Sequence, residues 1–423
     1  DERLAQAVYE VKGVFQEKLQ APTELRFYYR DDRIEVNRTI RVPATGYLLE
    51  METEVRLEGR SIPFKIVLGP GLGESEMPSS VDFAQPSVAY YQHGAVTRYT
   101  ADDVEDGPVQ LPGPARWVAL DSQYFTYLVL SPEGVRSIQI AKTEAHTDTA
   151  DGGSESQALV GAEVELAPAA PHAVFIGPKD HEILGQAETT LSQLIDYGWF
   201  GFLVKPLLLS LRFVYGYVHN YGWAIIILTF FINLALFPVR YKQMVSMKKM
   251  AHLQPQMKAI QAKYKNMKRD DPRRQKMNEE VMAMYKKHGV NPLGGCLPLL
   301  IQMPFLFAFY RMLFSSIELR GAPFIGWIQD LSQHDPYYIT PIVMGVSMVA
   351  QQQMTPATGD ATQRRMMMLM PVVFTFFFLS FSSGLVLYFL CSNLFGMMFQ
   401  LLMQRWTPEM AAPDPEKRTE KKK

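Results

Sequence analysis

Hydrophobic and polar positions divide the chain into two parts with different periods. Up to about residue 185, short segments that are rich in β-branched and aromatic residues alternate with turn clusters such as 69–71 and 131–134. Beyond that point, apolar residues recur at helical spacing or form long uninterrupted runs. The pattern predicts an antiparallel β-sandwich over residues 1–185, followed by an α-helical region.

Five apolar runs in the second part are candidates for membrane-spanning helices. They lie near residues 223–240, 297–316, 337–352, 366–381 and 385–403. A hydrocarbon layer about 30 Å thick needs about 20 helical residues, so the third and fourth runs, at about 15 residues each, are short. Short spans thin the bilayer locally, and here we expect thinning to matter for function.

The segment 186–220 predicts an amphipathic helix that lies along the membrane surface. Its apolar part, 207–218, is only about a dozen residues long, holds Arg212 and is rich in aromatic residues, so we interpret it as too short to span. The alternative is a buried core helix.

Charge separates the two parts further. The overall net charge of -1 combines a net of -15 over residues 1–200 with +14 over residues 201–423. Segment 241–289 predicts a helical hairpin with an apolar stripe, and residues 406–423 form a second basic segment, a tail. Because loops rich in Lys and Arg stay in the cytoplasm, the hairpin and tail are predicted to be cytoplasmic and the acidic part to lie outside.

The sequence contains few candidates for chemistry. Its two cysteines, Cys296 and Cys391, lie in apolar segments, and we find no nucleophile with a base, no metal motif and no cofactor motif. We therefore predict no enzyme activity, no cofactor, no metal and no small-molecule substrate.

Polar side chains inside the apolar runs are the candidate functional residues. They are expected to line a wetted concavity, the substrate groove, formed by Thr229, Asn233, Gln302, Arg311, Thr375, Tyr388 and Ser392. A cation such as Arg311 inside a span costs roughly 2.5–3.5 kcal/mol unless it faces protein or water. A groove of this kind would hydrogen-bond a polar peptide segment and attract its acidic side chains.

Each candidate has an alternative interpretation. Arg311 could extend to the outer interface, and Asn233 could make an ordinary interhelical hydrogen bond. The basic hairpin could contact ribosomal RNA or anionic lipid, or could simply be a solvated loop that sets topology. Its candidate contact residues are Lys248, Lys249, Lys258, Arg273 and Arg274.

Long stretches resemble the YidC-type bacterial membrane protein insertases of the YidC/Oxa/Alb superfamily. The stretches are NPLGGCLPLLIQMPFLFAFY (291–310), APFIGWIQDLSQHDPYYI (322–339), LMPVVFTFFFLSFSSGLVLYFLCSN (369–393), RWVALDSQYFTYLVL (116–130) and DYGWFGFLVKPL (196–207). The resemblance implies a periplasmic β-sandwich, an interfacial helix, a five-helix core (221–405) with a groove open to the cytoplasm, and a location in the inner membrane. It also implies nascent membrane proteins as clients, with the ribosome, the Sec translocon and membrane lipids as partners. The N-terminal anchor helix usual in the family does not occur in this sequence, which we interpret as a truncated chain.

One departure from the family pattern concerns the groove cation. Family members usually carry an arginine at the position of Asn233, whereas the position of Arg311 is more often an uncharged aromatic. We hypothesise that the cation has moved from the first core helix to the second. The function that follows is a membrane protein insertase and chaperone, with a secondary transporter or a membrane assembly scaffold as alternatives.

Overall fold

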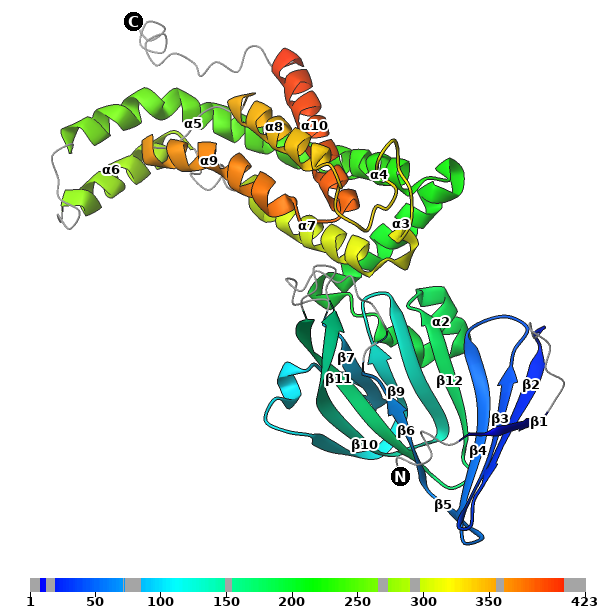
Figure 1. The fold of residues 1–423 in the computed structure, drawn as a ribbon. Helices are drawn as coiled ribbons and strands as arrows, with labels where there is room; N and C mark the ends of the chain where they lie inside the picture. The colour runs from blue at the N-terminus through cyan, green and yellow to red at the C-terminus, as the bar shows by residue number, and fades with distance from the viewer. Residues whose placement is uncertain are drawn as a thin grey trace, which may run out of the picture. The chain divides into compact units, whose positions relative to one another are not determined.

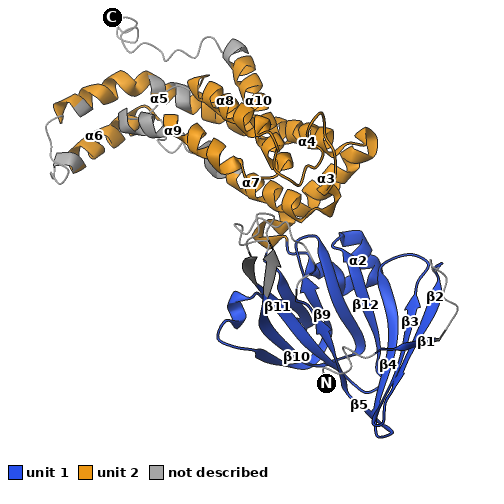
Figure 2. Cartoon of the chain, viewed as in Figure 1, with its two compact units in different colours: residues 1–196 blue, residues 197–423 orange. Residues whose placement is uncertain are grey.

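The computed structural model describes residues 8–12, 20–70, 72, 85–148, 154–264, 273–289, 297–354 and 361–406. Within these ranges, side chains at 12, 145–148, 154–157, 247, 248, 251, 261, 273, 274, 297–302, 361–367 and 404–406 are outside the description. The chain divides into two compact units, residues 1–196 and 197–423 (Figure 2). The division falls within the segment 186–220.

The first unit is built on one antiparallel sheet of twelve strands (Figure 1). Its strands are β1 (Glu10–Lys12), β2 (Thr23–Arg30), β3 (Ile34–Val42), β4 (Leu48–Leu57), β5 (Arg60–Ile62), β6 (Phe64–Leu68), β7 (Ser87–Gln92), β8 (Ala95–Tyr99), β9 (Val109–Asp121), β10 (Phe125–Asp148), β11 (Ser154–Leu166) and β12 (Pro171–Pro178). The short helices of this unit are η2 (Asp102–Val104), α2 (His181–Ala187) and η3 (Thr189–Leu194).

Strand β10 forms the branch point of this sheet. Its first part pairs with β12, its later part from Ser137 pairs with β11, and β9 follows both parts. The register with β9 shifts between Leu130 and Ser137. Irregularities of this kind bend a strand and increase its twist, so the two parts of β10 diverge into separate branches of the sheet. The expected antiparallel β domain is confirmed.

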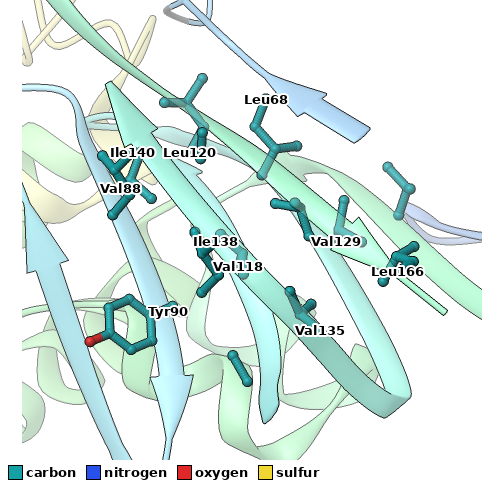
Figure 3. Close-up of a cluster of buried hydrophobic side chains, with 14 of the residues drawn as sticks. Leu68, Val88, Tyr90, Val118, Leu120, Val129, Val135, Ile138, Ile140 and Leu166 are labelled. Carbon is teal, nitrogen blue, oxygen red and sulfur yellow. The ribbon is translucent and has the colours of Figure 1, made fainter. Parts of the chain in front are cut away.

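The apolar core contains side chains from both branches (Figure 3). Alternate residues on β9 and β10 point into it, including Val118, Leu120, Ile138 and Ile140, as expected for strands with one face toward the core. On the other face of β9, Trp117 is fully buried, and its indole Nε1 donates to Thr190 Oγ1 in η3 at 3.2 Å.

The second unit is helical, as predicted. Its elements are η4 (Gly198–Phe200), α3 (Gly201–Val218), α4 (Tyr221–Ala235), α5 (Phe237–Lys263), α6 (Arg273–Lys287), α7 (Leu297–Ser315), η6 (Ile317–Leu319), α8 (Ile339–Met354), α9 (Ala361–Phe378) and α10 (Ser383–Trp406). Helix α10 packs against α4, α7 and α8, while α9 packs on α8. Helices α5 and α6 lie side by side (Figure 1), with a small core of Met250, Leu253, Met257 and Met284.

Helix lengths partly follow the predicted spans. Among the described residues, Gly198–Val218 and Ser383–Met403 are each long and apolar enough to cross a membrane, and the pair Tyr221–Ala235 and Phe237–Ser246, bent by 55°, makes a third if it is one span. Met303–Ser315 and Met368–Phe378 are shorter apolar helices.

The apolar part 207–218 was predicted to be too short to span a membrane. That prediction is wrong about length, because the helical segment that contains it, Gly198–Val218, is long enough. Pro206 does not mark the start of the helix, because α3 begins at Gly201 and Pro206 lies inside it. The carbonyl that a proline obstructs is four residues earlier, here Phe202, which lies in the first turn of α3. The orientation of α3 along the membrane surface stays a prediction.

An ion pair joins α3 to the segment after α7. Arg212 Nε donates to Glu318 Oε1 at 2.8 Å, Arg212 Nη2 contacts the same oxygen, and both side chains are largely buried. We expect Arg212→Ala to reduce the free energy of unfolding by about 1–2 kcal/mol, because it leaves a largely buried carboxylate without this partner. A double-mutant cycle with Glu318→Ala measures the coupling, and strictly additive effects of the two substitutions would contradict it.

Candidate functional site

Two of the candidate groove residues lie on α4 and are fully buried. Thr229 Oγ1 donates to the carbonyl of Ile225 at 2.6 Å, and Asn233 Nδ2 donates to the carbonyl of Thr229 at 2.7 Å. Both side chains therefore bond to their own helix. The Oδ1 atom of Asn233 is buried without a hydrogen-bond partner among the described residues. Since buried polar atoms are nearly always paired, this acceptor is an exception that needs an explanation.

Two further candidates lie on α10, four residues apart. Tyr388 is 2% exposed and stacks on Phe309 of α7, with ring centroids 4.1 Å apart and planes at 14°. Ser392 is 3% exposed and lies one turn further along the same face. The neighbouring Asn393 is turned toward α8, where its Nδ2 donates to Ser347 Oγ at 3.3 Å.

Arg311 lies on a different side of α7. Its guanidinium is about 3.6 Å from the point where a Cβ on Gly198 would lie, so it packs against η4. One turn earlier on α7, the ring of Phe307 stacks on that of Phe200 in η4, with the ring centroids 5.9 Å apart. Residues two apart on a helix point in nearly opposite directions, so Arg311 faces away from the side on which Phe309 meets Tyr388.

The hypothesis that the groove cation moved to Arg311 is therefore not supported by this geometry. The sequence places Arg311 inside the run 297–316 but does not show which face of the helix it occupies. Its position beside Gly198 agrees with the alternative in which the side chain reaches toward an interface.

Thr375 lies in a helix–helix contact. Its hydroxyl donates to the carbonyl of Pro371 at 2.7 Å and packs so closely on Gly345 of α8 that any Cβ there would collide with it. The glycine thus permits close approach of α8 and α9, and Thr375 belongs to that contact rather than to the α4–α10 face.

The remaining candidates are only partly described. The side chains of Gln302, Lys248, Arg273 and Arg274 lie outside the described residues, and those of Lys249 and Lys258 are exposed on α5. A role for these basic residues in ribosome or lipid contact stays a prediction.

Arg240 is a functional candidate that the sequence analysis missed. It is half-buried on α5, and its Nη1 lies 3.0 Å from the point where a Cβ on Gly396 of α10 would lie. The amide Nε2 of Gln351, on α8, lies 2.6 Å from the same point. Arg240 also interacts electrostatically with Tyr388.

The register of α4 and α5 could have revealed Arg240. Backbone hydrogen bonds continue through the junction between α4 and α5. The N–H of Leu236 donates to the carbonyl of Ile232, and the N–H of Arg240 donates to the carbonyl of Leu236. Counting on from Thr229 and Asn233 at helical spacing therefore leads to Arg240 on the same face. The predicted first span ends at Arg240, and the predicted groove residues do not include it.

These observations define a polar stripe between α4–α5 and α10. It consists of Thr229, Asn233, Arg240, Tyr388 and Ser392, with Gly396 opposite Arg240. The stripe is closed by packing at Asn233 and Ser392 and is half-exposed at Arg240.

Comparison with known proteins agrees with the division of the chain into a β unit and a helical unit. Residues 2–210 match the family profile described as "YidC periplasmic domain", and residues 213–410 match "60Kd inner membrane protein". "Membrane protein insertase YidC" of Nitratidesulfovibrio vulgaris (strain DP4) is 39% identical over 396 residues, which cover 90% of this chain and 70% of the relative. The chain belongs to the YidC family. The inferred resemblance is confirmed.

Other YidC relatives are similar over a smaller share of their length. The protein of the same name from Citrifermentans bemidjiense is 45% identical over 308 residues, 72% of this chain and 55% of the relative. The chain therefore spans little more than half the length of this relative. A solved structure titled "Active YidC insertase crystal structure with the first transmembrane domain resolved" covers 93% of this chain and 79% of its own, with 20% identity and a TM-score of 0.42, a similarity too weak to carry a conclusion.

Membership of the YidC family establishes where the parts of the chain belong. The β unit is a periplasmic domain and the helical unit is part of an inner-membrane protein, so the predicted localisation is confirmed. YidC relatives are named as insertases and not for a chemical reaction.

Proposed function

We propose that this chain is a membrane protein insertase and chaperone without catalytic activity or cofactor. It receives nascent membrane proteins from the cytoplasmic side, holds their polar flanks along the polar stripe and releases their transmembrane segments into lipid. The observation that carries the proposal is the buried Oδ1 of Asn233, which has no hydrogen-bond partner within the described part of this YidC-family chain and lies between apolar helices.

The stripe lowers the barrier to crossing by offering hydrogen bonds where lipid offers none. An unpaired peptide group in hydrocarbon costs several kcal/mol, so a flank crosses more easily if protein groups replace water. Asn233 Oδ1 can accept from a backbone N–H, and Ser392 can donate or accept. Because both are buried here, α4 and α10 separate when a client enters, beginning at the half-exposed end beside Arg240.

Short helices contribute to the same barrier. Helix α8 has 16 residues, a length of about 24 Å, against a hydrocarbon core of about 30 Å. The bilayer beside it thins, which shortens the path of the client. The exposed Lys249 and Lys258 on the hairpin supply contacts to the ribosome or to anionic lipid, and the Sec translocon is a further partner.

Reconstitution of the chain into liposomes tests the proposal. A client with one transmembrane segment and a short polar flank is synthesised in the presence of these liposomes, and insertion is measured as protease protection of the flank. We expect protection with the chain and little without it. Equal protection in empty liposomes contradicts the proposal. Flux of a small solute would favour a transporter, and client binding without protection would favour a scaffold.

A further inference from the structure

Arg38 is a cation in the periplasmic unit for which the described residues supply no counter-ion. Val36, two residues earlier on β3, lies in the apolar core, and strand alternation turns Arg38 to the same inward face. Among the described residues, Arg38 makes no hydrogen bond or ion pair, and its Nε atom is buried without a partner. The arginines on the outward face of β2–β4 are instead each paired with a glutamate; they are Arg26, Arg41 and Arg56.

Two buried hydroxyls without partners lie on the same inward face. Thr53 of β4 is directly opposite Arg38 in the antiparallel register, so their Cβ atoms are about 4.5–5.5 Å apart. Ser131 follows the last β10 residue that pairs with β12, where β10 begins to bend. Thr53 is 2% exposed and Ser131 is 0% exposed, and neither hydroxyl has a hydrogen-bond partner within the described part of the chain. We call these three residues, together with His172 on the intervening strand β12, the inward polar patch.

His172 adds no charge to the inward polar patch. Burial is the largest influence on the pKa of His172 and lowers it, a hydrogen bond with the carbonyl of Ala170 opposes this effect, and the charge of Arg38 lowers the pKa further. The imidazole is therefore neutral at neutral pH. Its ring packs on Phe64 of β6, with the ring centroids 5.7 Å apart. Alternate residues from 34 to 42 on β3 and from 49 to 57 on β4, which face inward, include no Asp or Glu, so the patch carries one positive charge.

Water alone does not account for the inward polar patch. Ordered water can pair buried hydroxyls, but it does not offset the charge of a guanidinium that is held away from bulk solvent. A small anion does both, because the Nε–H of Arg38 and the hydroxyl of Thr53 can donate to it. Arg38 is half-buried, so an ion can enter beside its side chain. Since Thr53, Ser131 and His172 are at most 4% exposed, that ion has to be small.

We propose that Arg38 and Thr53 bind one small monovalent anion, of about the size of chloride, inside the periplasmic unit. The anion neutralises the guanidinium and links β3 to β4. The stability of the periplasmic unit then depends on the identity of the anion in solution and not only on ionic strength. This inference is independent of the proposed insertase function, which uses the helical unit.

Hydrogen exchange of β3 and β4 amides in the full chain tests the site. Exchange is compared in sodium chloride and in sodium gluconate at equal concentration, because gluconate has the same charge and is too large to enter. We expect exchange to be about tenfold slower in chloride, as for a ligand present at about ten times its Kd. No difference between the two salts would show that the patch holds water only and would overturn the proposal.

Three variants separate a bound anion from general effects of salt. Arg38→Gln should abolish the difference between chloride and gluconate. In gluconate it should exchange no faster than the unsubstituted chain, because it removes a cation that has no counter-ion there. Thr53→Val, which removes one donor, should reduce the difference. Arg41→Gln is the matched control, since Arg41 lies on the outward face of the same strand and is paired with Glu52, and it should keep the full difference.

Bromide locates the anion directly. In crystals of the full chain grown with bromide in place of chloride, we expect an anomalous scattering peak beside Arg38 Nε and Thr53 Oγ1. Each variant is compared with itself in the two salts, so a loss of overall stability does not affect the result. A chloride effect that persists in Arg38→Gln, one that disappears equally in Arg41→Gln, or bromide peaks that all lie elsewhere would each overturn the assignment.

Discussion

Trp117→Ala is expected to reduce the free energy of unfolding of the periplasmic unit by about 3–5 kcal/mol. Trp117 is fully buried, stacks on Tyr91 with ring centroids 5.8 Å apart, and donates a hydrogen bond to Thr190. The substitution leaves a large cavity between β9 and η3 and removes the hydrogen bond that the Thr190 hydroxyl accepts, while that hydroxyl still donates to Glu188. Both effects act on the segment that leads out of the sheet toward the helices.

Hydrogen exchange of β9 amides in the full chain measures this change. Trp199→Ala is the matched control, because Trp199 is 98% exposed and its removal creates no cavity. We expect the control to leave β9 protection unchanged. Similar protection in both variants would show that Trp117 does not stabilise the sheet.

Asp335→Asn is expected to destabilise the loop before α8 by about 2–3 kcal/mol. The carboxylate is 2% exposed and uses both oxygens: Oδ1 accepts from Trp327 Nε1 and from the N–H of Tyr337, and Oδ2 accepts from the N–H and hydroxyl of Thr340. The amide of asparagine has only one acceptor oxygen. Its NH₂ group would therefore face either the donors that now bond Oδ1 or those that now bond Oδ2.

Asp330→Asn provides the comparison for Asp335. Asp330 accepts both of its hydrogen bonds, from the N–H and hydroxyl of Ser332, on Oδ1 alone. An asparagine there can keep its carbonyl oxygen at that position, so we expect a small effect. Proteolysis of the loop between α7 and α8 measures both variants, and equal susceptibility would contradict the assigned role of Asp335.

The same carboxylate predicts that the stability of the loop before α8 depends on pH. Burial, the largest single influence, raises the pKa of Asp335, but hydrogen bonds from Thr340, Tyr337 and Trp327 together outweigh it and hold the pKa below its usual value of 3.8. Because the folded-state pKa is lowered, the stabilisation is present above the usual pKa and is lost as the pH falls through the lowered one. Loop protection should therefore persist to below about pH 4 in the unsubstituted chain.

The division into a β domain and a helical region could be predicted because each has its own period of apolar residues. The course of β10 could not. The cluster 131–134 resembles a turn between two strands, and Gly134 does adopt a positive φ of 85°, yet the chain continues as one strand. Pairing with β9 along both parts, a long-range interaction, overrides this local signal.

The candidate site was predicted less completely than the fold. Asn233, Thr229, Tyr388 and Ser392 could be selected because polar residues in apolar runs are rare. Arg311 was included among the groove residues because sequence spacing does not show which side of α7 meets α10, and its guanidinium packs against η4. Arg240 was missed because charge patterning treats an arginine at the end of a span as part of a loop, although α5 continues the helix past it.

Contact between the client and the buried stripe is the central claim, and disulfide crosslinking tests it most directly. In a chain with Cys296 and Cys391 replaced by serine, a cysteine replaces either Ser392, in the stripe, or Phe213, which is 67% exposed on α3. Each is combined with a client that carries one cysteine in its polar flank and is arrested during insertion. We predict crosslinks from position 392 that disappear after release into lipid, and few from position 213. Crosslinks from position 213 with none from 392 would show that the flank crosses outside the helix bundle.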